Sequence, residues 1–138
     1  MDDAASFYFD IPATDALGKL NVSGKLRAVA DKVELHWKEK DRTFTRSKNQ
    51  LHTVELDYEQ IEDAHIRGSF FFTKHLILRV TDPRLIEEMP GVKMGTVELE
   101  LPKRSLAEAK RFVSMIEYRA SEKAVERSAE RLKEFDIE

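Results

Sequence analysis

The most regular feature of the chain is an alternation of apolar and polar positions that recurs between residues 24 and 101. A period of two places apolar side chains on one face of a β-strand and polar side chains on the other. One further strand is expected from Ile61 to about Arg67. The five alternating segments have these inward-facing residues: Leu26 and Ala28; Val33, Leu35 and Trp37; Val54, Leu56 and Tyr58; Leu76, Leu78 and Val80; Val97, Leu99 and Leu101.

The end of the chain follows a helical period instead. Apolar residues recur at spacings of three and four from Leu106 to Ala120, and Ser105 with Glu108 has the spacing of a capping box, which marks a helix N-terminus. No Gly or Pro follows Pro102, so the helix is expected to run from about Ser105 to Phe135. At 1.5 Å per residue it spans about 45 Å, which is more than one sheet of this size needs.

These patterns divide the chain into three parts. Residues 1–23 combine aromatic residues with turn formers and are interpreted as an arm that docks on the domain. Residues 24–120 form the domain, and residues 121–138 form a helical extension. Within the domain, Asp82 followed by Pro83 predicts a short helix up to Met89.

The composition indicates which classes of protein and which cellular compartment fit this chain. The net charge is −3, with 41% hydrophobic and 36% charged residues, which is typical of a globular chain and not of a general nucleic-acid binder. The chain has no Cys, which excludes disulfides, thiolate catalysis and cysteine metal clusters and fits a reducing compartment. A signal-peptide pattern and an apolar run of about 20 residues are both absent, so we expect a cytoplasmic protein.

Catalytic motifs are also lacking. The sequence contains no Gly-rich phosphate loop, no Gly-x-Ser-x-Gly turn and no Cys nucleophile, and the spacing of its four histidines matches no metal-ligand motif. Adjacent acids such as Glu62 and Asp63 point to opposite faces of a strand and so do not converge on one cleft. We expect a non-enzymatic protein without a catalytic site, bound metal, cofactor or identifiable small-molecule substrate.

The order of elements resembles one family. The hairpin opening Gly24-Lys25-Leu26-Arg27, the segment Val54-Glu-Leu-Asp-Tyr-Glu-Gln-Ile61-Glu-Asp-Ala64 and the final amphipathic helix are together similar to a bacterial pleckstrin-homology-like (PH-like) domain. The resemblance covers roughly residues 24–120 and rests on topology and hydrophobic pattern, without a diagnostic motif.

The resemblance implies a mainly β, α+β fold: an antiparallel split β-barrel of six to seven strands capped by the C-terminal helix. The seventh strand is expected from residues 70–72 or 82–95, and a different α+β sheet with one helix remains the alternative. It also implies a binding or interaction module. In the lipid-binding branch, basic residues surround the first hairpin loop, whereas here that loop is short and contains Asp31.

The helical extension is the first candidate binding surface. Acidic and basic residues form separate columns along it, and a third line of mostly small residues allows another helix to approach closely. We expect this line to dock on a protein partner or a second copy, with the charged columns setting the orientation; a solvated tail is the alternative. The residues on and beside the line are Ala120, Ala124, Ser128, Leu132 and Phe135.

The second candidate surface is the basic segment 38–48. It has five basic and two acidic residues, with an aromatic residue between them, and this composition suits an anion or the headgroups of a peripheral membrane surface. The alternative is a solvated connection between two strands. The candidate residues are Lys38, Lys40, Arg42, Phe44, Arg46 and Lys48.

Overall fold

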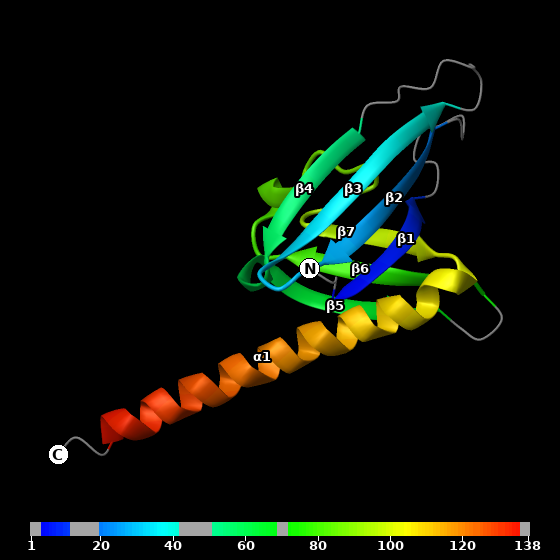
Figure 1. The fold of residues 1–138 in the computed structure, drawn as a ribbon. Helices are drawn as coiled ribbons and strands as arrows, with labels where there is room; N and C mark the ends of the chain where they lie inside the picture. Colours follow the sequence, from blue (N-terminus) through cyan, green and yellow to red (C-terminus); the bar gives the residue numbers. More distant parts are fainter. Residues whose placement is uncertain (1–3, 12–19, 42–50, 69–71, 136–138) are drawn as a thin grey trace.

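The computed structural model describes residues 4–11, 20–41, 51–68 and 72–135 (Figure 1). The elements in chain order are β1 (Ala5–Ile11), β2 (Leu20–Ala28), β3 (Lys32–Asp41), β4 (Leu51–Asp57), η1 (Tyr58–Gln60), β5 (Ile61–Arg67), β6 (Lys74–Val80), η2 (Pro83–Ile86), β7 (Thr96–Leu101), η3 (Lys103–Ser105) and α1 (Leu106–Phe135). The labels η1 to η3 denote short 3-10 helices.

The strands form one antiparallel sheet with the order β4-β3-β2-β1-β7-β6-β5. Two meanders, β1 to β4 and β5 to β7, meet where β1 lies beside β7, and the register there joins only Asp10 with Glu100. The sheet is therefore open rather than closed, in a split-barrel arrangement with β4 and β5 at its edges. The expectation of a mainly β, α+β fold with a split sheet and a long C-terminal helix is confirmed.

The seventh strand comes from a part of the chain where we did not expect it. Residues 5–11, interpreted above as an arm, are β1 at the centre of the sheet, with Ala5, Phe7, Phe9 and Ile11 buried. The segment from 82 to 95 instead begins with η2, where the Asp82 carboxylate accepts a hydrogen bond from the Arg84 N–H as the capping signal predicted. β1 lies between β2 and β7 and buries its apolar face like its neighbours. Residues 5–11 are therefore part of the domain and not an arm docked on it.

The expected domain boundary at residue 24 is also wrong, because Gly24 lies in the middle of β2. It pairs with Phe9 on β1 and with Trp37 on β3. A Cβ atom at this position would lie 2.4 Å from Cζ of Phe9 and 2.5 Å from the backbone oxygen of His36. The glycine is required by close packing inside the sheet rather than by a strand terminus.

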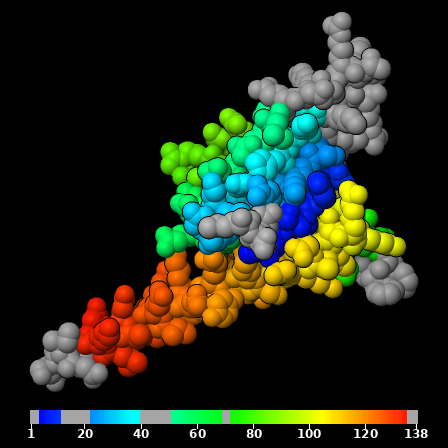
Figure 2. Space-filling view, in the orientation of Figure 1, coloured from blue at the N-terminus to red at the C-terminus, as the bar shows by residue number. Residues whose placement is uncertain are grey.

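The first half of α1 packs on the sheet. Ala109, Phe112 and Ile116 are buried, and the Phe112 ring lies 6.0 Å from the ring of Phe7. α1 contacts β1, which borders the split, and the edge strand β5. Beyond this region the helix projects away from the sheet (Figures 1 and 2). Every described side chain from 120 to 134 is exposed.

The start of α1 is anchored by two long-range hydrogen bonds. The Ser105 hydroxyl donates to the carbonyl oxygen of Tyr8 at 2.6 Å, and the Glu108 carboxylate accepts from the N–H of Ser6 at 3.1 Å. Both backbone groups belong to the edge of β1 that faces the split. The predicted helix start is confirmed within one residue, but these two side chains satisfy a strand edge instead of forming the expected capping box.

Candidate interaction site

Helix α1 leaves the sheet at Arg119. The guanidinium lies 3.7 Å from the centre of the Tyr58 ring and donates a hydrogen bond to the carbonyl oxygen of Ala30 at 3.0 Å. The Tyr58 hydroxyl in turn donates to the carbonyl oxygen of Val29. These contacts join the helix, η1 and the β2–β3 turn, and they fix the direction in which the rest of the helix extends.

Burial raises the pKa of the Tyr58 hydroxyl above its ordinary value, although the nearby positive charge of Arg119 opposes the shift. Tyr58 therefore stays neutral at physiological pH and continues to donate its hydrogen bond.

A groove of about 490 Å³ lies between α1 and the η1–β5 corner. Its apolar floor contains Ile61 and Ile116, and Glu59 on its rim forms a 3.5 Å ion pair with Lys123. Side chains of the ion pair are well exposed to solvent, so it contributes little to holding the extension in place. The helix beyond the groove is therefore stabilised mainly by its own backbone hydrogen bonds.

The structure separates the residues predicted on the extension into two groups. Ala120 and Ala124 line the groove, whereas Ser128 and Leu132 lie beyond it. All four are exposed, with Leu132 at 65%. Phe135 ends α1, and its side chain lies outside the described part of the chain.

Two large apolar residues lie on another side of α1 from Ala120 and Ala124, and the sequence pattern had not assigned Tyr118 to the candidate surface. Tyr118 is 64% exposed and Val125 is 68% exposed, and both lie on the same side of α1 as Leu132. Their seven-residue spacing equals about two helical turns, which keeps them on one side of the helix, whereas the line of small residues at four-residue spacing turns around it. We call Tyr118, Ser121, Val125, Ser128 and Leu132 the outer seam.

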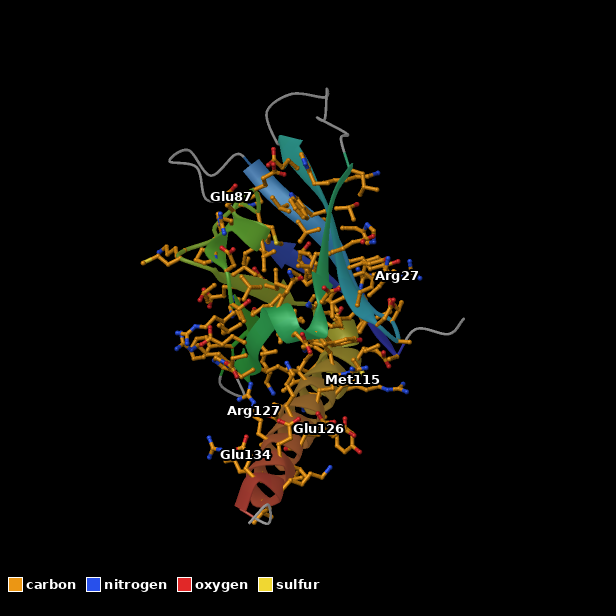
Figure 3. All side chains as sticks on the ribbon, turned by 90° about the vertical axis from the view of Figure 1, so that its left-hand side faces the viewer. Arg27, Glu87, Met115, Glu126, Arg127 and Glu134 are labelled. Carbon is orange, nitrogen blue, oxygen red and sulfur yellow. The ribbon has the colours of Figure 1, made fainter. Side chains whose placement is uncertain are left out.

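The outer seam faces away from the domain. At about 100° per residue, Val125 lies about 180° around the helix from the buried Ile116, and Tyr118 and Leu132 lie within about 20° of Val125. The face that continues the buried stripe carries Lys123, Arg127, Glu130 and Glu134 instead. Figure 3 labels Arg127 and Glu134 on the free half of the helix, below the sheet.

Tyr118 carries a polar contact at the edge of the seam. A hydrogen bond to Glu122, one turn further along the helix, raises the pKa of the Tyr118 hydroxyl. The ring of Tyr118 is apolar, and its hydroxyl already has a hydrogen-bond partner at the edge of the seam. Tyr118 can therefore pack against another helix without leaving a polar group unpaired.

The basic segment is only partly within the described structure. Lys38 is exposed on the outer face of β3, where it pairs across the sheet with Leu51 on β4. Lys40 belongs to β3, but its side chain is outside the described part, and Arg42, Phe44, Arg46 and Lys48 lie wholly outside it. The structure therefore brings none of these residues together at a described site.

A second hollow, of about 470 Å³, lies on the outer face of β5, β6 and β7. Arg79 and His65 line it, and each has an acidic neighbour: Arg79 lies 3.8 Å from Glu62, and Nδ1 of His65 lies 2.7 Å from Asp63. Among the described residues, no group of three or more acidic or histidine side chains is arranged to hold a metal ion.

In the described part of the chain, no helix has the length and apolar content needed to cross a membrane. Comparison with protein-family models, with curated proteins and with solved structures finds no match to this chain.

Proposed function

We propose that this protein is a non-enzymatic, PH-like interaction module that binds a protein helix, its own or another protein's, through the free half of α1. The observation that supports the proposal is the change of apolar side at the end of the sheet. Up to Ile116 the apolar residues face the domain, and from Tyr118 onward the large apolar residues face away from it.

The physical argument concerns the stability of the extension. A segment of about 15 residues is marginal as an isolated helix in water, and the exposed ion pair between Lys123 and Glu59 adds little to its stability. Val125 and Leu132 lie on one side of it and gain nothing from their own domain, which occupies the opposite side. A second helix that covers them would remove apolar surface from water and stabilise the extension at the same time.

The experiment uses the absence of Cys in the chain. Ser128→Cys places a single thiol on the outer seam, and Lys123→Cys places one on the opposite face as a matched control. Each variant is labelled with a photoreactive benzophenone and irradiated in an extract of its native cells, and adducts are identified by mass spectrometry. We expect one dominant adduct from position 128, reduced by adding Val125→Ser, and little from position 123.

Equal adduct patterns from the two positions would contradict the proposal, since they would indicate only random encounters along an exposed helix. A dominant adduct from position 123 would instead assign binding to the face that continues the groove.

The second candidate function is binding of anionic lipid headgroups or other anions through the basic segment 38–48. The favouring observation is that exposed Lys38 lies across from Leu51, which is 55% exposed, so a cation and an apolar side chain share one end of the sheet. Sedimentation with anionic vesicles should show retention of the chain that decreases with salt and with Lys38→Glu. Absence of retention at low salt would exclude this function.

A further inference from the structure

The spacing of the outer seam is that of a two-helix contact. Tyr118, Val125 and Leu132 are seven residues apart, and Ser121 and Ser128 lie between them, which gives alternating steps of three and four. These are the a and d positions of a heptad, with a large apolar residue at each a position and serine at each d position. Because the seam lies on the side of α1 opposite the buried Ile116, a partner can reach it without contacting the sheet. The free half of α1 projects from the sheet (Figures 1 and 3).

We infer that the occupant of the outer seam is a second copy of this chain, packed antiparallel. The inference rests on the proposed function and specifies its partner. In an antiparallel pair in which Val125 of one copy opposes Ser128 of the other, Leu132 opposes Ser121. Each large side chain thus meets a small one in both central layers, and helices pack most closely when large and small residues alternate across the contact.

The parallel arrangement lacks this match. It places Val125 against Val125 and Leu132 against Leu132, but it leaves Ser121 and Ser128 facing their own copies, so well-filled layers alternate with layers of two small polar residues. A reversed copy of the seam places its small residues opposite the large residues of the first copy. An unrelated helix need not carry large and small residues in this order.

Charges beside the seam favour the same orientation. In a parallel pair, Glu117 of one helix would lie beside Glu122 of the other, and the two-fold symmetry would place this like-charge contact on both sides of the pair. In the antiparallel register, Glu122 lies near Lys133 of the second copy, and the symmetric contact repeats this opposite-charge pair. Charge and size therefore select one orientation of a self-pair.

The first experiment measures self-association of the full chain by sedimentation equilibrium over a range of concentrations. We expect a monomer–dimer equilibrium that Val125→Ser weakens by about tenfold or more, because a symmetric dimer loses the buried methyl groups twice. Arg127→Ser, two residues away on the opposite face, is the matched control and should leave the equilibrium unchanged within about twofold. Circular dichroism of each variant checks that the helix is retained.

The second experiment determines orientation by disulfide formation. In the antiparallel register, Cys residues introduced by Ser121→Cys would be about 16 Å apart along the axis between copies, which is too far for a disulfide. A mixture of Ser121→Cys chains with Leu132→Cys chains should instead yield a cross-linked heterodimer under mild oxidation. Parallel pairing predicts the reverse, with rapid linkage of Ser121→Cys chains to each other.

Linkage of Ser121→Cys chains to each other would overturn the antiparallel inference. A dimer that is insensitive to Val125→Ser would overturn the role of the outer seam. A chain that remains monomeric up to about millimolar concentration would overturn self-pairing altogether, yet a seam-specific adduct with a different protein in the extract would still support the proposed function.

Discussion

Replacing Ser105 by Asp distinguishes the two roles that its position at the start of α1 suggests. As an N-cap, serine acts through an oxygen that accepts hydrogen bonds, and Asp performs this role about equally well, so the substitution would be close to neutral. In the structure the hydroxyl of Ser105 donates to the carbonyl oxygen of Tyr8 at 2.6 Å, and the residue is only 2% exposed. An ionised carboxylate cannot donate and would face that carbonyl oxygen in a dry site.

The magnitudes follow from these contacts. Ser105→Ala removes one buried hydrogen bond and leaves the Tyr8 carbonyl oxygen unpaired, which costs about 1–3 kcal/mol of unfolding free energy. Ser105→Asp adds an unpaired charge, so its total cost should reach about 3–5 kcal/mol near neutral pH. The expected order of stability is Ser, then Ala, then Asp. For a chain of this size, each kcal/mol lowers the melting temperature by about 3–5 °C.

Urea denaturation followed by circular dichroism measures the three unfolding free energies. The pH dependence supplies a second test of the same contact. Below the pKa of the introduced carboxyl group, a protonated Asp can donate to Tyr8, so the variant should recover part of its deficit relative to Ser105→Ala as the pH falls toward 4. If Ser105→Asp were as stable as the parent chain at pH 7, the anchoring role of Ser105 would be refuted and the capping role restored.

Two further changes test the packing of the sheet and of the corner where α1 leaves it. Gly24→Ala should destabilise the fold by about 1–3 kcal/mol in urea denaturation, because the new methyl group overlaps the Phe9 ring and adjacent backbone, whereas Ser23→Ala on the outer face should have little effect; equal stability of the two variants would contradict the close approach. The raised pKa of Tyr58 means that its contribution to stability is complete below about pH 10 and is lost as the pH rises through the higher folded-state value. The parent chain should therefore lose more stability than Tyr58→Phe between pH 9 and 11, and parallel losses would argue against the burial of this hydroxyl.

The sequence predicted the elements whose determinants are local. Alternation predicted five strands, a sixth was expected from Ile61 to about Arg67, and the absence of Gly and Pro after Pro102 predicted the length of α1. β1 was missed because its alternation, Phe7, Phe9 and Ile11, is interrupted by the outward-facing Tyr8, which makes the segment resemble an aromatic cluster. The partners that make it a central strand are distant in sequence.

The hydrogen bonds at the start of α1 also depend on partners that are distant in sequence. Ser105 and Glu108 have the spacing of a local capping motif, but their hydrogen-bond partners lie 97 and 102 residues earlier in the chain. Pattern alone cannot distinguish a side chain that satisfies its own helix from one that satisfies an unpaired strand edge. That distinction depends on the sheet being split beside β1, which is a property of the assembled fold.

The line of small residues predicted on the extension and the outer seam lie on different sides of the same helix. Steps of four residues advance about 40° around an α-helix, so the line from Ala120 to Leu132 turns through about 120° and begins in the groove beside the domain. Alternating steps of three and four keep one side, and from Tyr118 they follow the outer seam.

The point at which the apolar side changes also explains the length of α1. A helix that only covered the opening of the sheet could end near Ala120, where its last contacts with Tyr58 and the β2–β3 turn are complete. Continuing it with apolar residues on the same side would have exposed them in the groove, next to the buried Ile61. Placing Lys123 and Arg127 there, and Val125 and Leu132 on the far side, keeps the extension off its own domain and makes its apolar face available to another helix.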